Sequence, residues 1–249
     1  MIAWDEAGTG TPIVFVHGLT EDRRGWDPVI AHLTDRFRCV RLDLRGHGQS
    51  SDAEDYSALA MAEDVATLVA EAQIFQAPLI VGHSLGAVVA TAYATQAPVR
   101  GVVNIDQSLR LGDFAAALQP LAPMLQDPDS FLPTLLAVFD GLGIPESLDP
   151  RDRTYLTDLH NNARQAVVLG VWGLVFDSSP DELTAIAESL LGALTVPYVA
   201  IHGSDPGPGY AEWLAGALPG ARVEVWEGDG HYPHLAEPGR LASLIDSIS

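Results

Sequence analysis

A serine between glycines forms the centre of the pentapeptide GHSLG, residues 82–86. The apolar run 78–81 precedes it and the apolar segment 87–94 follows it, so the pattern predicts a strand that turns sharply into a buried helix. Such a turn holds its central residue in a strained backbone conformation, for which flanking glycines leave room. The alternative is a glycine-rich turn whose serine only caps the helix. The flanking strand and helix favour the first interpretation, which makes Ser84 the candidate nucleophile.

A serine hydroxyl is a weak nucleophile at neutral pH and needs a base that an acid orients. His231 is the candidate base, because it lies on a glycine-rich loop after the strand-like segment 222–226 and its ring can reach over the sheet edge. His234 is the weaker candidate, since Pro233 and the following helix restrict it. His17 and His83 flank the predicted oxyanion donors and the nucleophile, where the backbone rather than the side chain is expected to act. The remaining histidines are expected to be packed or on the surface: His32, His47, His160 and His202.

Two aspartates are candidates for the acid. Asp205 follows the apolar strand 197–203, and Asp106 follows the apolar strand 101–105. Both strand ends should lie at the same sheet edge as Ser84, where either carboxylate could hold the imidazole in its working tautomer. Asp205 is favoured because it precedes His231 by 26 positions, with one helix and one strand between, in the chain order serine, aspartate, histidine. For either residue, the structural alternative is a loop carboxylate that binds nearby backbone amides.

A fourth feature is a buried strand, residues 13–16, that runs into the turn His17-Gly18. The turn can aim a backbone amide at a developing oxyanion, and the amides of Leu19 and Leu85 are the predicted pair of donors. Such donors contribute about 3–4 kcal/mol each to transition-state stabilisation. The alternative is a tight turn that simply requires glycine.

Together, four motifs in this order resemble the α/β-hydrolase family: residues 14–18, 43–50, 82–86 and 228–231. The resemblance extends from about residue 2 to the C-terminus, except for the middle third. It implies a mostly parallel, doubly wound α/β sheet with a helical cap insertion. In the family, the segment resembling 43–50 is a loop that shapes the sheet edge and is not catalytic. Arg45 and His47 are therefore not assigned to catalysis.

The resemblance contains one departure, at the predicted acid. Family members commonly place two residues between the glycine after the late strand and the acid, whereas only Ser204 separates Gly203 from Asp205. Some relatives carry the acid after the earlier strand instead. Asp106 therefore remains open as the acid.

Strands alternating with helices predict a mostly parallel sheet over residues 1–106 and 196–249, which the resemblance implies is an α/β-hydrolase core. Residues 107–195 lose this alternation and predict a helical cap, in which residues 179–182 (SPDE) form a helix start. A minority of the apolar cap residues is expected to line an acyl pocket, the rest packing the cap: Met124, Leu125, Phe131, Leu135, Phe139, Val168, Trp172, Leu174 and Phe176.

Composition indicates a compact enzyme. The 249 residues include 13 basic and 33 acidic side chains, a net charge of −20, which disfavours nucleic acids and anionic membranes as partners. The single cysteine, Cys39, permits neither an intrachain disulfide nor a cysteine metal site and is expected to be a packed hydrophobe. No secretion signal is visible, so a cytoplasmic location is expected. No cofactor or metal is expected, and a homodimer is left open.

These residues predict a serine hydrolase that cleaves carboxylic esters of small apolar substrates through an acyl-enzyme. A serine at the turn argues against haloalkane or epoxide hydrolysis, for which relatives use a carboxylate nucleophile. The alternatives on the same residues are lactone opening, C–C bond hydrolysis and cofactor-free perhydrolysis. A non-catalytic small-molecule receptor is a further, less favoured, alternative.

Overall fold

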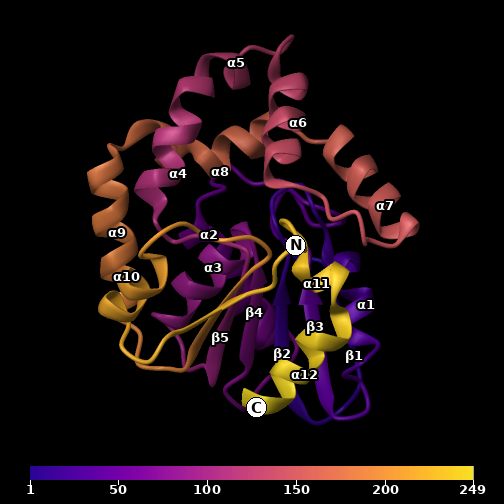
Figure 1. Ribbon diagram of the computed structural model, residues 1–249. Coiled ribbons are helices and arrows are strands. Elements are labelled where there is room, and N and C mark those ends of the chain that lie inside the picture. Colours follow the sequence, from indigo (N-terminus) through magenta and orange to yellow (C-terminus); the bar gives the residue numbers. More distant parts are fainter. Residues whose placement is uncertain (249) are drawn as a thin grey trace.

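The computed structural model describes residues 1–248, which form one seven-stranded sheet in the order β1-β3-β2-β4-β5-β6-β7 (Figure 1). Only β1 is antiparallel to its neighbour, and the other strands are parallel. The strands are β1 (Trp4–Ala7), β2 (Thr11–Val16), β3 (Phe37–Leu42), β4 (Leu79–His83), β5 (Gly101–Ile105), β6 (Tyr198–His202) and β7 (Arg222–Val225). The predicted fold class is confirmed.

Helices cover both faces of the sheet, which explains why β4, β5 and β6 are buried along their whole length. Side chains alternate along β2, so that Val14 and Val16 pack on one face while Ile13 and Phe15 pack on the other. The first face is covered mainly by α2 (Ala58–Glu71), α3 (Leu85–Ala94) and α10 (Tyr210–Ala217), and the second by η1 (Arg23–Trp26), α1 (Asp27–Ile30) and α12 (Pro238–Ile248) (Figure 1).

The register of the parallel strands brings their carboxyl ends to one edge. His83 is paired with Ile105, and Ile105 is paired with Ile201, so the chain leaves β4, β5 and β6 at nearly the same level. Ser84 and Asp106 each follow the last residue of their strand, and Gly203 does the same after β6. Three loops that are far apart in sequence therefore meet at this edge, where ligands bind in open α/β sheets.

Above this edge, residues 107–197 contain helices and, within the described part of the chain, no strand (Figure 1). The predicted helix start at Ser179 is confirmed, because Ser179 and Glu182 form a reciprocal capping box. The helices are α4 (Leu111–Leu118), η2 (Gln119–Leu121), α5 (Ala122–Gln126), α6 (Phe131–Leu142), α7 (Pro150–Asn161), α8 (Gln165–Asp177) and α9 (Pro180–Gly192). The short helix α11 (Pro233–Ala236) lies outside this segment, after the His231 loop.

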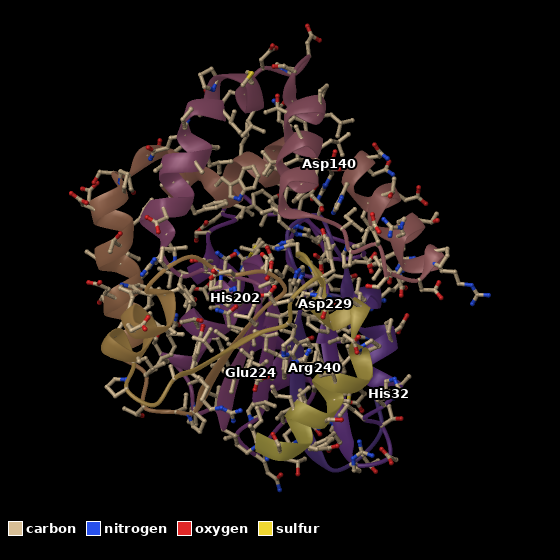
Figure 2. The ribbon with its side chains drawn as sticks, in the orientation of Figure 1. His32, Asp140, His202, Glu224, Asp229 and Arg240 are labelled. Atoms are coloured by element: carbon tan, nitrogen blue, oxygen red, sulfur yellow. The ribbon has the colours of Figure 1, made fainter. Side chains whose placement is uncertain are left out.

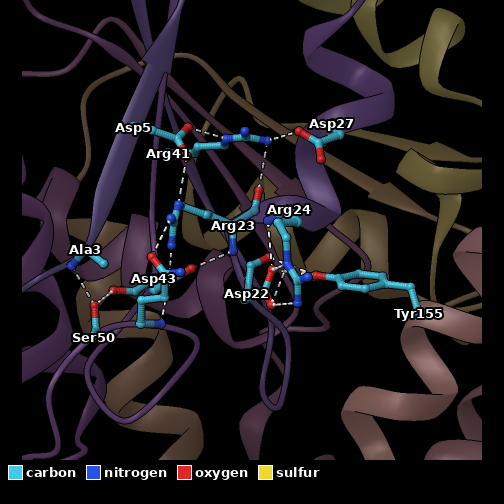
Figure 3. Close-up of polar contacts among 11 residues, drawn as sticks. Ala3, Asp5, Asp22, Arg23, Arg24, Asp27, Arg41, Asp43, Ser50 and Tyr155 are labelled. Carbon is cyan, nitrogen blue, oxygen red and sulfur yellow. Dashed lines mark hydrogen bonds and ion pairs between the residues drawn. The ribbon is translucent and has the colours of Figure 1, made fainter.

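A polar contact connects this helical segment to the core. The Tyr155 hydroxyl on α7 donates a hydrogen bond to Asp22 Oδ1 at 2.8 Å, and Arg24 pairs with the same carboxylate at 2.6 Å (Figure 3). Beside it, Arg23 bridges the carboxylates of Asp5 and Asp43. Because Asp22 is largely buried and paired, this contact holds α7 in one position over the sheet edge.

Cys39 is fully buried in β3, as expected for a packed hydrophobe. Within residues 1–248, no helix combines the length and apolar character needed to cross a bilayer.

Burial raises the pKa of the Cys39 thiol to about 12, so the reactive thiolate should be scarce in the folded protein. We expect no reaction with Ellman's reagent at pH 8 under native conditions and one thiol per chain after unfolding in guanidinium chloride. Rapid stoichiometric reaction of the native protein would show that β3 is exposed in solution.

Candidate active site

Ser84 occupies the sharp turn between β4 and α3, with φ 50° and ψ −121°. Its amide donates to the Ile105 carbonyl at 2.9 Å, and its side chain makes no capping bond to the helix. A Cβ on Gly86 would overlap the carbonyl oxygen of Val16, and one on Gly82 would overlap the backbone of Gly86. The glycines thus allow β2, β4 and α3 to approach closely, and packing sustains the strained serine. The interpretation of Ser84 as a simple helix cap is wrong.

His231 and Asp106 form a close pair at the same edge. Asp106 Oδ2 lies 2.6 Å from His231 Nδ1, and its Oδ1 accepts the amide of Gly203 at 2.8 Å. Burial by itself raises the pKa of Asp106, but the hydrogen bond and charge of His231, with the Gly203 amide, outweigh it and hold the pKa below its usual value. Asp106 is therefore a carboxylate that orients the imidazole of His231.

The expectation that Asp205 orients His231 is corrected by this geometry. Asp205 is exposed, and its Oδ1 accepts the amide of Gly207 at 2.9 Å within its own loop. Asp106 instead adopts a φ of 51°, which turns the chain at the end of β5. The short loop after Gly203 leaves Asp205 bound to nearby backbone, the structural alternative that the sequence offered for either aspartate.

The second candidate base, His234, lies elsewhere. It is 1% exposed, and its ring packs 4.8 Å from that of Trp26 and 4.4 Å from that of His83. Burial lowers its pKa well below the usual value. Since His231 is the histidine that meets Asp106, the geometry favours His231 over His234 as the base.

Leu19 and Leu85 both line the cavity that contains Ser84. Among residues 1–248, neither backbone amide has a hydrogen-bond partner. Leu85 begins α3, where amides are free of intrahelical bonds, and Leu19 follows the Gly18 turn. These two amides thus remain the predicted donors to an oxyanion.

The loop 43–50 has a structural role, as the family resemblance implied. Asp43 Oδ2 accepts the amide of Gln49 at 2.8 Å, and Arg45 pairs with Asp64 at 2.7 Å. His47 Nδ1 donates to the Arg45 carbonyl at 3.0 Å, and burial lowers the pKa of His47 to about 3, so its imidazole is neutral. Within residues 1–248, no hydrogen bond or ion pair joins the side chains of Asp43, Arg45 or His47 to Ser84 or His231.

The cavity over Ser84 has a volume of about 410 Å³ and lies between the sheet edge and the helices α4, α6, α8 and α9. Of the nine apolar residues considered from the sequence, Phe139, Trp172 and Leu174 line it, and the others do not. Sequence reasoning missed further apolar lining residues: Val88, Leu111, Phe114, Val138, Leu142, Val171, Val175 and Leu183. Several lie three or four positions apart on one helix, a spacing that could have indicated their shared face.

Polar side chains also line the cavity that contains Ser84. His202 lies beneath the helical segment and lines the cavity, whereas His32 is on the outer surface near α1 (Figure 2). His202 Nδ1 is 3.9 Å from Asp106 Oδ1, and burial lowers the pKa of His202. Arg110 also lines the cavity and stacks over Tyr210.

Among residues 1–248, the potential metal-ligand cluster is Glu21, His83 and His234, all buried.

Residues 13–244 match the Alpha/beta hydrolase family. The match covers most of the chain and agrees with the sheet order and the strained serine turn. The chain belongs to this family.

The similar proteins include a curated esterase. An uncharacterized protein of Mycobacterium tuberculosis is 29% identical over 96% of this chain and 75% of its own length. The pimeloyl-[acyl-carrier protein] methyl ester esterase of Nitrosomonas europaea is 26% identical over 98% of both chains. The crystal structure of a bromoperoxidase from Bacillus anthracis has the same fold, with a TM-score of 0.80 at 18% identity, covering 99% of this chain and 94% of that one.

The two aspartates provide a direct test of the site geometry. Asp106→Asn should lower kcat for an activated ester about 10⁴-fold, because the amide no longer holds the correct histidine tautomer. Asp205→Asn, the matched exposed control, should change kcat less than about twofold, since its carboxylate contacts only its own loop. A large loss for Asp205→Asn with little for Asp106→Asn would contradict the assignment.

Proposed function

We propose that the protein is a serine carboxylic ester hydrolase with Ser84, His231 and Asp106 as its catalytic residues. The observation that carries this proposal is the buried Asp106–His231 pair beside a serine held at φ 50° in the same cavity. The curated esterase among the similar proteins supports the same reaction class.

In the proposed mechanism, His231 removes the proton of Ser84 as the hydroxyl attacks the ester carbonyl. The amides of Leu19 and Leu85 bind the oxyanion of the tetrahedral intermediate. His231 then protonates the departing alcohol, and a water molecule activated by the same histidine releases the acid from the acyl-enzyme. Asp106 stabilises the imidazolium in both halves of the reaction and stays ionised.

The lining and volume of the cavity support the proposal that the substrates are small and apolar. Aromatic and aliphatic side chains form much of its wall, including Phe114, Phe139 and Trp172. A volume of about 410 Å³ lies within the range of small-molecule sites. An apolar acyl or alcohol group can bury its surface against these walls while the ester carbonyl meets the leucine amides. A lactone is a cyclic ester, so the same residues would open its ring by the same acyl-enzyme reaction.

Covalent labelling and turnover together test the proposal. A fluorophosphonate probe should label one site, and Ser84→Ala should abolish both labelling and hydrolysis of p-nitrophenyl esters. Ser108→Ala is the matched control, since Ser108 lines the same cavity but lies outside the strained turn, and it should retain labelling. A series of acyl chain lengths, with lactones and peracid formation in parallel, then identifies the preferred substrate.

Labelling that survives Ser84→Ala would overturn the assignment of the nucleophile. Saturable ligand binding without turnover in the wild-type protein would favour the receptor alternative.

A further inference from the structure

Two buried ionisable side chains that the proposed mechanism does not use lie directly behind the site. Glu21 is 4% exposed and His83 is fully buried, and Glu21 Oε1 lies 2.8 Å from His83 Nδ1. The distance is that of an ion pair between a carboxylate and a protonated imidazole. A buried carboxylate without a partner is strongly unfavourable, so the position of Glu21 depends on the groups that pair with it.

Glu21 also holds the turn that carries the predicted oxyanion donor. Its Oε2 accepts the Gly18 amide at 3.0 Å, and Gly18 directly precedes Leu19. A Cβ on Gly18 would lie 2.6 Å from Glu21 Oε1 and 2.9 Å from His83 Nδ1. A side chain at position 18 would therefore have to displace the Glu21 carboxylate or the His83 ring, and glycine leaves room for both.

His83 in turn holds the loop of the proposed base. Its Nε2 lies 2.7 Å from the His231 carbonyl oxygen, and the two rings are 4.8 Å apart. A carbonyl oxygen only accepts, so His83 Nε2 must donate. The Glu21 carboxylate oxygen lies 2.8 Å from His83 Nδ1 and would repel the lone pair of an unprotonated nitrogen, so Nδ1 must carry a proton as well. With both nitrogens protonated, His83 is an imidazolium cation.

The pKa directions agree with this charge state. Burial would lower the pKa of His83, but the charge and contact of Glu21 and the His231 carbonyl raise it overall. Burial would raise the pKa of Glu21, but His83 and the Gly18 amide lower it overall. Each ion is thus stabilised by the other.

We propose that the Glu21–His83 ion pair is a positioning device for catalysis, which ties the oxyanion turn at Gly18 and the backbone of His231 to the end of strand β4. One carboxylate and one imidazolium connect three loops, each of which supplies a group to the reaction. Neither side chain lines the cavity that contains Ser84. This inference rests on the proposed function, because it assigns the ion pair a role in the Ser84 reaction.

The same residues form a cluster with His234 in which potential ligand atoms lie within 4.8 Å of one another. Both ring nitrogens of His83 are occupied, however, one by Glu21 and one by the His231 carbonyl. A protonated imidazole has no lone pair for a metal ion. The hydrogen-bond geometry therefore favours an ion pair over a metal site.

A double-mutant cycle with Glu21→Gln, His83→Gln and the double variant tests the coupling. Each single variant should lower kcat roughly tenfold or more while KM changes little, because each leaves one buried ion without its partner. The double variant should recover most of this loss, since two side-chain amides can repeat the same chain of hydrogen bonds without charge. Additive losses, or single variants within twofold of wild type, would overturn the proposal.

The control is His234→Gln, which changes the third buried residue of the cluster but no bond to Gly18 or His231. It should keep kcat within a few-fold of wild type when circular dichroism shows it folded. The rate of fluorophosphonate labelling at Ser84 should follow kcat in all variants. If labelling does not depend on Ser84 at all, the proposed function fails; if it does but the cycle shows no coupling, only this inference fails.

The pH profile separates a positioning role from simple stabilisation. His83→Gln leaves the Glu21 carboxylate uncompensated, which favours protonated His231, so the acid limb of kcat/KM should move to higher pH. The titratable groups that face His231, Asp106 or the ion pair are Asp106, His83, Glu21, His160, His202, Tyr232 and His234. An unchanged or lowered acid limb would contradict the proposal.

Nitrogen-15 NMR of the wild-type protein needs no variant to fold. Both ring nitrogens of His83 should be protonated at neutral pH, and added Zn²⁺ should leave this resonance unchanged. A neutral His83 ring, or stoichiometric Zn²⁺ binding that His234→Gln abolishes, would overturn the ion pair.

Discussion

The strained backbone of Ser84 is the constraint on which the rest of the site depends. A non-glycine residue at a positive φ is held there only when its surroundings over-determine it. Here the surroundings are the close contacts among β2, β4 and α3, which Gly82 and Gly86 make possible, and the bond from the Ser84 amide to Ile105. The serine is exposed to the cavity because the sheet and helix are packed too tightly to let it turn inward.

Charge burial is the second constraint, and the chain meets it by pairing. Asp106 is matched by His231 and the Gly203 amide, and Glu21 is matched by His83 and the Gly18 amide. Each pair joins a strand end to a loop from a distant part of the sequence. The net charge of −20 is carried largely by exposed carboxylates, so it does not conflict with these buried pairs.

The helical segment and the sheet edge share the work of shaping the cavity. The loops at the sheet edge supply Ser84, Asp106 and His231, and the helices α4, α6, α8 and α9 supply most of the apolar wall. The backbone of His231 also reaches this segment, since its amide donates to the Gly143 carbonyl at 2.9 Å. Because Gly143 directly follows α6, this hydrogen bond joins the end of α6 to the loop of the proposed base.

Much of the fold and part of the site were predictable from local sequence. The run of apolar strands, the glycines around Ser84 and the loop of His231 are patterns in consecutive residues, and they predicted the sheet, the strained turn and the base candidate. The backbone conformation at each of these features is determined by residues that are close together in the sequence. Strand order then follows from the few topologies that parallel α/β sheets allow.

The acid and the cavity wall were decided only by the tertiary structure. Asp106 and Asp205 follow equally apolar strands, and the place of Asp205 one helix and one strand before His231 favoured Asp205. Which carboxylate meets the imidazole depends on side-chain direction: Asp106 is turned by its positive φ and fixed by Gly203, whereas Asp205 binds its own loop. The Glu21–His83 pair was likewise invisible, because its members lie 62 positions apart and meet only when β2 and β4 pair in register. Local sequence determines which backbone shapes form, but contacts between loops at a sheet edge are set by three-dimensional packing.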